Sequence, residues 1–223
     1  MKNIFKPFFL LFLGQSLAQT TQYKTLTDLS YYENLVNEAY QNKRCKLDLY
    51  YPEGVKNYST VVWFHGGGLK SRSKAIPKQI KEKDFAVFLV NYRLHPKVNV
   101  PKYIEDAAAL AWVLKNIEWY GGDKKQIYIC GFSSRGYLSL MVALDQKWLK
   151  EQSLESNFTK GVVALSTITF TNHTVRKDYG MEISQALIDQ FTPVYYTKGD
   201  APQIRLVTGD REKEFFIMYY ENA

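Results

Sequence analysis

Hydrophobic positions along this 223-residue chain change their spacing from one segment to the next. Residues 44–52 (RCKLDLYYP) alternate polar and apolar side chains, which is typical of a strand with one exposed face. Residues 60–64 (TVVWF) and 85–90 (FAVFLV) are instead continuous apolar runs. Runs of this kind occur in central strands that are covered on both faces. These three segments predict a sheet with one half-exposed strand and buried central strands.

A helical spacing follows the second apolar run. From Pro101 to Ile117, apolar residues recur every three or four positions opposite charged side chains, and the GGD sequence at 121–123 ends the pattern. Proline is favoured at the first position of a helix, and this spacing gives a helix one apolar face. We expect further elements at 126–130 (strand), 134–144 (helix), 161–166 (strand), 181–190 (helix) and 203–209 (strand). Alternating strands and helices predict an α/β fold with a mainly parallel sheet.

The first 18 residues have the layout of a secretory signal peptide. Lys2 and Lys6 precede a short apolar run, and small residues lead to an expected cleavage site after Ala18. The run is shorter than the roughly 20 apolar residues of a membrane span. We therefore expect residues 1–18 to be a signal peptide and residues 19–223 to form one domain. The mature protein would be secreted or periplasmic, with no membrane attachment.

Amino-acid composition adds few constraints on the fold and function. A hydrophobic content of 46% and an aromatic content of 15% are sufficient for one sizeable core. The net charge is +7, and without Lys2 and Lys6 it falls to +5. Basic residues are scattered along the chain rather than clustered, so we expect no nucleic-acid partner. Cys45 and Cys130 lie in apparent strands that the fold would separate, and we expect two free, buried thiols.

The sequence HGGG at residues 65–68 directly follows an apolar strand. Three glycines let the backbone pass close to a ligand and point its N–H groups into a cavity, as an oxyanion hole requires. The simpler alternative is a flexible turn at the end of a strand. The position directly after a buried strand favours the oxyanion hole.

The sequence GFSSRG at residues 131–136 lies between a predicted strand and a predicted helix. A sharp turn here would raise the Ser133 hydroxyl above the sheet, at the N-terminus of the helix. Ser134 is the alternative nucleophile, because Gly136 follows it by two residues, but Phe132 would then occupy the preceding glycine position. We favour Ser133, which leaves Arg135 where a second glycine is expected.

Four motifs follow one another along the chain: HGGG, NYRLHPK, IEDAAALAWVLKNIEWYGGD and IYICGFS. This ordered set resembles the α/β-hydrolase superfamily. Within it, the set is nearest to the bacterial carboxylesterase-like acetyl-ester and feruloyl-ester esterases and to the hormone-sensitive-lipase group. The resemblance covers residues 40–223 and implies a three-layer α/β-hydrolase fold. It implies Ser133 as the nucleophile, with the amides of Gly67, Gly68 and Ser134 as the oxyanion hole. The implied substrate is a small carboxylic ester, for example one formed by an acyl group on a carbohydrate. No cofactor and no metal ion are implied.

The same resemblance places the triad acid after the strand that ends at Gly209, where Asp210 and Glu212 both qualify. The triad histidine should follow the acid in the chain. The histidines are His65, His95 and His173, and none follows residue 210. We therefore expect the last strand and the loop that carries the base to be missing from this sequence. His173 is retained as a less favoured substitute.

Two hypotheses for the function remain. The favoured one is a serine hydrolase of carboxylic ester bonds. The alternative is a non-catalytic or degenerate hydrolase-fold protein, motivated by Arg135 and by the missing base. We expect Arg135 to disturb the tight turn, since extra bulk in close packing costs about 1 to 3 kcal/mol. Alternatively, its side chain could extend outward to bind an acidic substrate. The sequence does not predict an oligomeric state.

Overall fold

A computed structural model describes most of the chain between residues 20 and 209. The described ranges are 20–32, 38–71, 73–106, 109–154, 158–182, 188–197 and 201–209. The expected signal peptide, residues 1–18, lies outside them, as do both candidate triad acids, Asp210 and Glu212.

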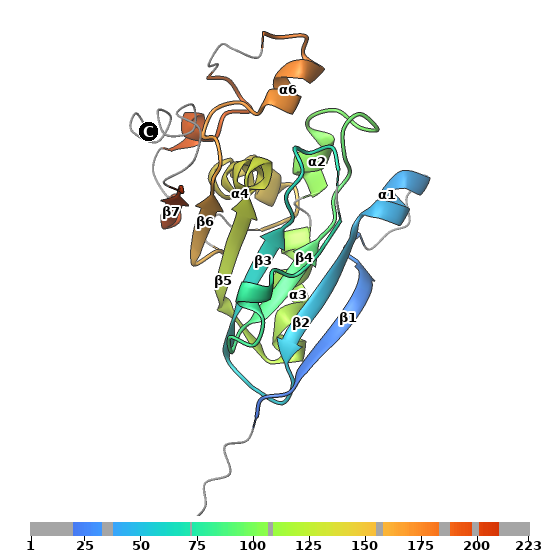
Figure 1. Ribbon diagram of the computed structural model, residues 1–223, viewed down its shortest axis with the longest axis vertical. Helices are drawn as coiled ribbons and strands as arrows, with labels where there is room; N and C mark the ends of the chain where they lie inside the picture. The colour runs from blue at the N-terminus through green and yellow to red at the C-terminus, as the bar shows by residue number, and fades with distance from the viewer. Residues whose placement is uncertain are drawn as a thin grey trace, which may run out of the picture.

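Seven strands of this described part form one sheet in the order β1-β2-β4-β3-β5-β6-β7 (Figure 1). Strand β2 is antiparallel to both of its neighbours, whereas the pairs from β4 through β7 are parallel. The strands are β1 (Tyr23–Ser30), β2 (Lys46–Pro52), β3 (Tyr58–Phe64), β4 (Ala86–Val90), β5 (Gly122–Phe132), β6 (Gly161–Leu165) and β7 (Ile204–Val207). The predicted α/β fold with a mainly parallel sheet is confirmed.

The two continuous apolar runs differ in how they are covered. Every residue of β4 is buried, as predicted, but burial alternates along β3, where Val61 and Trp63 remain half-buried. The reason lies on the face of the sheet that carries Trp63. A small cluster covers this face, in which Ile76 and Ile80 from the region of the short helix η1 (Lys78–Ile80) pack beside Trp63. The main core covers the opposite face.

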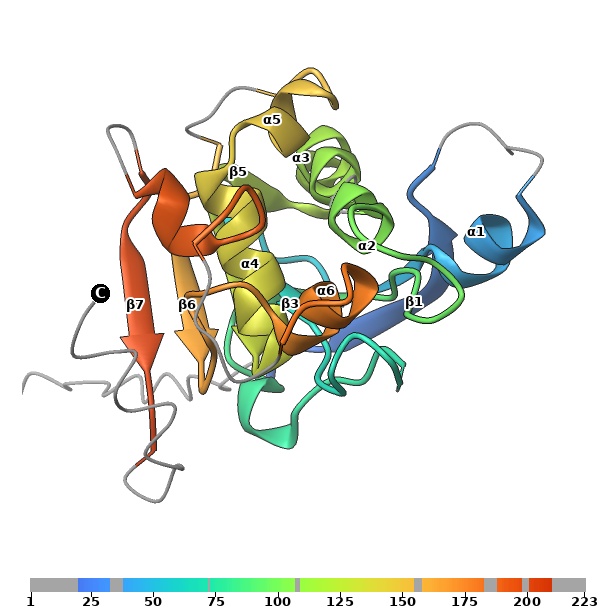
Figure 2. The same ribbon diagram turned by 90° about the horizontal axis from the view of Figure 1, so that it is seen from above.

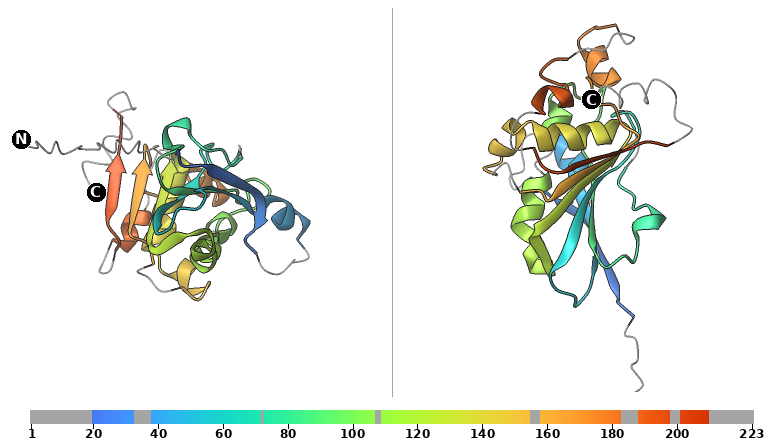
Figure 3. Two further views of the ribbon diagram at one scale, coloured as in Figure 1. Left: turned by 90° about the horizontal axis from the view of Figure 1, so that it is seen from below. Right: turned by 90° about the vertical axis from the view of Figure 1, so that its left-hand side faces the viewer.

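Helices α3 and α4 cover the main-core face, and η1 lies on the other side (Figure 3, right). The helices are α1 (Ala39–Arg44), α2 (Lys102–Glu105), α3 (Ala109–Tyr120), α4 (Ser134–Leu144), α5 (Lys147–Lys150), α6 (His173–Asp178) and the 3₁₀ turn η3 (Pro193–Tyr196). All eleven residues of α4 are buried between the sheet and the segments above it. None of the helices in the described ranges has the length and apolar content to cross a membrane.

The predicted helix at 134–144 is confirmed with the same bounds, and the one from Pro101 is present as α2 and α3. The helix expected at 181–190 is not found at the described residues 181–182 and 188–190, and the others lie outside the described ranges. Helix α6 precedes that region instead. Its cap explains the location, because the Asn172 side chain accepts a hydrogen bond of 2.9 Å from the Thr174 amide.

Both cysteines are free, as predicted. Cys45 is buried, but Cys130 is only half-buried, and Cys45 lies at the end of α1 rather than within a strand. The strands β3, β5 and β6 run parallel, so their carboxyl ends meet at one edge of the sheet, below α6 (Figures 1 and 2). Functional groups of open α/β sheets gather at this edge.

Candidate active site

Ser133 occupies a strained turn between β5 and α4. Its φ of 61° and ψ of −132° lie in a region that residues with a side chain rarely adopt. Two hydrogen bonds hold this conformation. The Ser133 amide donates to the Leu165 carbonyl at 2.8 Å, and the Ser133 carbonyl accepts from the Thr167 hydroxyl at 2.7 Å. Strand β6 and the residues after it therefore fix the turn that presents the Ser133 side chain.

Two glycines let the turn approach its surroundings. A β-carbon at Gly131 would lie 2.2 Å from the carbonyl oxygen of Arg135, and one at Gly136 would lie 2.4 Å from Cβ of Thr167. Both distances are far below contact, so these positions require glycine. The disturbance expected from Arg135 does not arise at these two contacts, because they involve its backbone carbonyl and Thr167 rather than its side chain.

A pocket of about 230 Å³ opens above Ser133. Its lining consists of Gly68, Lys70, Ser133, Ser134, Ile168, Asn172, His173 and Thr174. Ser133 is half-buried, whereas Ser134 is buried and its hydroxyl has no hydrogen-bond partner within the described ranges. Of the two adjacent serines, Ser133 is thus the better placed to meet a ligand.

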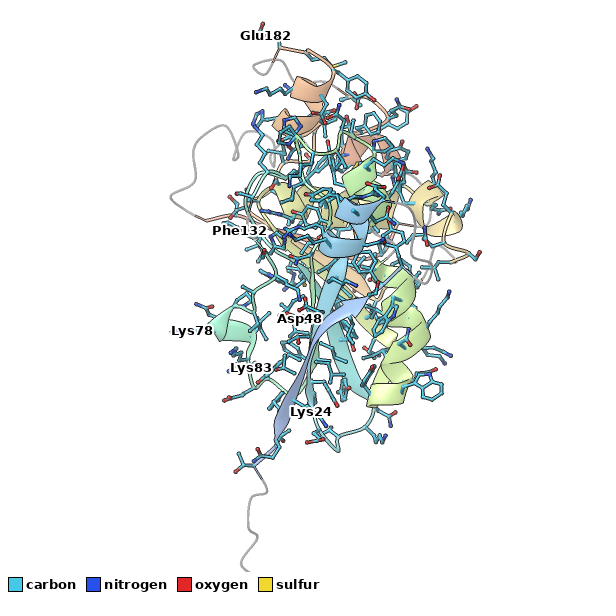
Figure 4. The ribbon with its side chains drawn as sticks, turned by 90° about the vertical axis from the view of Figure 1, so that its right-hand side faces the viewer. Lys24, Asp48, Lys78, Lys83, Phe132 and Glu182 are labelled. Atoms are coloured by element: carbon cyan, nitrogen blue, oxygen red, sulfur yellow. The ribbon has the colours of Figure 1, made fainter. Side chains whose placement is uncertain are left out.

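A larger, open hollow of about 740 Å³ lies at the far end of α4, next to Tyr195 and Tyr196. It is lined by neither serine of the turn and by none of the glycines of the HGGG loop, which we define as residues 65–71. The exposed Phe132, labelled in Figure 4, precedes Ser133 at the carboxyl end of β5. Of these two cavities, the pocket above Ser133 is therefore the one that contains candidate site residues, namely Gly68, Ser133 and Ser134.

The glycines of the HGGG loop adopt backbone conformations that favour glycine. Gly67 has a φ of 127° and Gly68 a φ of 64°. The Gly67 carbonyl accepts hydrogen bonds from the amides of Lys70 and Ser71, and the Gly68 carbonyl accepts one of 2.8 Å from the Thr174 hydroxyl. The structure brings Gly68, Ser134 and Ser133 to one pocket. Gly67 is adjacent in the chain but does not line it.

The chain's histidines have three different environments. His65 is buried at the start of the HGGG loop, where its ring stacks on Tyr92 with centroids 5.2 Å apart. His95 lies in the loop after β4, with Nδ1 2.7 Å from the Asp178 carboxylate at the end of α6. His173 lines the pocket of Ser133. His173, the less favoured substitute for the triad histidine in the sequence analysis, is thus the histidine that lines the pocket of Ser133.

The pKa of His173 is lowered from its usual value. Burial is the largest cause, and the positive charges of Arg176 and Lys70 act in the same direction. The imidazole is therefore neutral at pH 7 and can accept a proton. Within the described ranges, no group of three or more histidine, cysteine or acidic side chains could hold a metal ion.

Sequence reasoning missed several residues around the site. Arg44 and Tyr92 reach His65 from α1 and from the loop after β4, and Thr174 reaches the HGGG loop from α6. Tyr92 lies in the NYRLHPK motif, so that motif was the available signal. Arg44 and Thr174 carried no local signal, because their contacts span 21 and 106 residues of chain.

Fold and site geometry define an α/β-hydrolase of the carboxylesterase-like type. A match to the BD-FAE family spans residues 47–182, and the chain belongs to this family. Among solved structures, a truncated form of a carbohydrate esterase from gut microbiota has a TM-score of 0.71 at 20% identity, over 92% of this chain and 86% of that one. Esterase B from Lactobacillus rhamnosis has a TM-score of 0.68 at 22% identity, over 90% and 69%.

Curated relatives match over shorter segments. A probable isoprenylcysteine alpha-carbonyl methylesterase of Arabidopsis thaliana is 34% identical over 121 residues, which is 51% of this chain and 28% of the relative. The carboxylesterase NlhH of Mycobacterium tuberculosis is 35% identical over 107 residues, 43% of this chain and 32% of the relative. The chain thus spans about a third or less of the length of these relatives.

Proposed function

We propose that this protein hydrolyses carboxylic ester bonds with Ser133 as its nucleophile. The observation that carries the proposal is the strained turn at Ser133, which opens into one pocket together with Gly68 and Ser134. Membership of the BD-FAE family and the esterase names of the similar proteins support it.

In this proposal, the Ser133 hydroxyl oxygen attacks the ester carbonyl carbon, and its proton passes to a base. The carbonyl oxygen becomes an oxyanion, which accepts hydrogen bonds from the amides of Gly67, Gly68 and Ser134. The C–O bond to the alcohol then breaks, and the alcohol leaves with the proton. Water hydrolyses the acyl-serine and returns the free carboxylic acid and Ser133. No cofactor or metal ion takes part.

His173 is the candidate base among the described residues, because it lines the pocket and is neutral at pH 7. Asp210 or Glu212 is the candidate acid that would orient a histidine. A positioned base matters because serine at its ordinary pKa is a poor nucleophile. The oxyanion hole alone would leave a rate of about 10³- to 10⁴-fold over water.

The proposed substrates are small esters. The pocket above Ser133, at about 230 Å³, is below the roughly 300 to 1,000 Å³ of most ligand sites, which favours a short acyl group. An acyl group on a carbohydrate is the finer proposal, and the carbohydrate esterase among the structural neighbours supports it. The proposed location is outside the cytoplasm, with residues 1–18 as the signal peptide. N-terminal sequencing of protein recovered from an expressing cell's exterior or periplasm would test cleavage after Ala18.

The experiment that tests the activity compares Ser133→Ala with Ser134→Ala as a matched control. Native protein and Ser134→Ala should release nitrophenol from 4-nitrophenyl acetate and should react covalently with a fluorophosphonate probe. In that reaction the serine oxygen bonds to phosphorus and fluoride leaves. Ser133→Ala should do neither. Equal turnover by Ser133→Ala would contradict the nucleophile assignment, and an unlabelled native protein would indicate a non-catalytic hydrolase fold.

A second measurement tests the base. Because burial, Arg176 and Lys70 lower the pKa of His173, the labelling rate should keep its full value down to the usual histidine range. It should fall only at lower pH, as the imidazole gains its proton. His173→Asn should remove this acid limb and slow labelling by about 10²-fold or more. An unchanged profile in His173→Asn would exclude His173 as the base.

A further inference from the structure

Arg135, two residues after Ser133, is a fully buried cation. Its side chain has 0% exposure and is among the largest completely buried side chains of the described ranges. It does not extend outward toward solvent, so one sequence-based expectation for it is wrong. Instead, the guanidinium passes beneath the HGGG loop, and its contacts are distributed over both ends of that loop.

At the end of the loop that follows β3, Arg135 acts through Tyr92. Its Nε donates to the Tyr92 hydroxyl, which lies 3.5 Å from the carbonyl oxygen of His65, and the guanidinium lies 5.7 Å from the Tyr92 ring centroid. Burial raises the pKa of Tyr92 to about 12 even though Arg135 opposes that shift, so the phenol stays protonated. It can therefore accept from Arg135 and donate to His65.

At the other end of the loop, Arg135 donates from Nη2 to the Ser71 carbonyl oxygen at 3.1 Å. The guanidinium also lies against the glycines between these ends. A β-carbon at Gly66 would lie 3.3 Å from Nη1, and one at Gly67 would lie 3.1 Å from Nη2. Gly66 and Gly67 therefore leave the space that the guanidinium occupies.

His65, the first residue of the HGGG loop, lies between two arginine side chains. Its Nε2 lies 3.3 Å from Nη2 of Arg44, and its Nδ1 lies 3.4 Å from Nη2 of Arg135 and 3.3 Å from the Gly66 carbonyl oxygen. The unprotonated nitrogen of an imidazole ring can accept a hydrogen bond from a guanidinium group. Two guanidinium groups thus flank the imidazole, which stacks on Tyr92. The positive charges of Arg44 and Arg135 therefore lie next to the HGGG loop.

We propose that Arg135 is a positioning residue, which holds the HGGG loop in place for oxyanion stabilisation and sets a positive charge behind that loop. The inference rests on the proposed function. A glycine at position 135 would give the tight turn more room. In this proposal, the Arg135 side chain at that position instead holds the HGGG loop. Charge placed near a developing oxyanion in a water-poor site stabilises the transition state more than the ground state.

The test compares Arg135→Lys, Arg135→Met and Arg135→Gly in the full chain, with the exposed Lys150→Met as a control. The first readout is amide hydrogen exchange of the HGGG loop, which needs no activity. Exchange there should be at least about tenfold faster in Arg135→Met and Arg135→Gly and unchanged in Lys150→Met. If a variant at Arg135 fails to fold, Tyr92→Phe removes one of its hydrogen-bond partners and leaves the turn intact, and should loosen the same amides.

The second readout is the fluorophosphonate labelling rate of Ser133. It should fall about 10- to 100-fold in Arg135→Met, and Arg135→Lys should recover part of the loss because it restores the charge. Native exchange rates in Arg135→Met and Tyr92→Phe would overturn the positioning role. Equal labelling of the Met and Lys variants would overturn the role of the charge. If even the native chain is not labelled, the proposed function and the charge role both fail, and the exchange data alone decide whether Arg135 holds the loop.

Discussion

Arg93 and Arg135 are both buried, and their polar groups are satisfied in different ways. Arg93, 2% exposed, donates to the Asp106 carboxylate at 2.8 Å and to Glu38 at 2.9 Å. Arg135, with no exposure, donates to a phenol hydroxyl and a backbone carbonyl and touches an imidazole. Burial would lower the pKa of Arg93, but its hydrogen bonds with Asp106 and the nearby negative charge raise it above its usual value.

Arg93 is bound by carboxylate groups in ion pairs, whereas Arg135 donates hydrogen bonds to uncharged groups. Asp106 also accepts a hydrogen bond from the Tyr32 hydroxyl at 2.8 Å and from the Arg93 amide at 2.6 Å. Arg93, in the loop after β4, therefore forms ion pairs with Asp106 at the end of α2 and with Glu38 at the start of α1, and breaking a buried ion pair is costly. Arg135 instead lies against Gly66 and Gly67 of the HGGG loop and donates to the Tyr92 hydroxyl and the Ser71 carbonyl. A mutation should affect mainly stability at Arg93 and mainly the site at Arg135.

The largest expected effect is that of Arg93→Met. It leaves the fully buried Asp106 without its cation, and we expect a loss of about 3 to 5 kcal/mol in the free energy of unfolding. Urea denaturation followed by tryptophan fluorescence would measure it. The double variant Arg93→Met with Asp106→Leu should regain much of the loss, because it removes both charges. A loss below 1 kcal/mol for the single variant would remove the contrast between the two arginines.

Gly136→Ala should have the next largest effect, of up to about 3 kcal/mol on unfolding, because its β-carbon would lie 2.4 Å from Thr167. This variant tests whether Gly136, rather than residue 135, makes the close approach behind the turn. The companion variant Thr167→Ser removes the methyl group near that β-carbon. Combining the two should recover part of the stability, and a fully stable Gly136→Ala would show that the turn has more room.

Arg135→Met should cost less, about 1 to 2 kcal/mol of unfolding free energy. It leaves the Tyr92 hydroxyl and the Ser71 carbonyl short of a donor, at a typical cost of about 1 to 3 kcal/mol, but it also removes a buried charge. The same urea titration measures this loss. A cost equal to that of Arg93→Met would mean that Arg135 is as much a part of the folding core as Arg93.

The smallest effect is expected for Lys102→Ala. Lys102 forms an exposed pair with Glu105 at 2.9 Å, and pairs of this kind change stability by no more than about 0.5 kcal/mol. The variant sets the baseline for a charged contact near Arg93. Its unfolding midpoint should coincide with that of the native protein at 0.15 M salt. A clear shift would show that Lys102 belongs to the Arg93 network.

Local sequence patterns were sufficient for much of the fold. The strands β4 and β6 and the helix α4 were found close to their observed bounds, because a continuous apolar run marks each of these strands and the helix follows the turn of GFSSRG. Helix α6 was missed, since its six residues are too few to show a period, and Asn172 was not recognised as its cap. Strand β1 was missed because its burial pattern is irregular and its core contacts come from pairing with β2.

For the site, the sequence by itself determined the candidate nucleophile Ser133 and the HGGG loop, because both depend on glycines and on their positions after strands. The tertiary structure alone decided two further points. It brought His173 to the pocket of Ser133, and it buried the Arg135 side chain against the HGGG loop. The physical reason is sequence separation. The contacts from Arg135 to Tyr92, Ser71 and His65 span 43 to 70 residues, and no local pattern encodes contacts at that range.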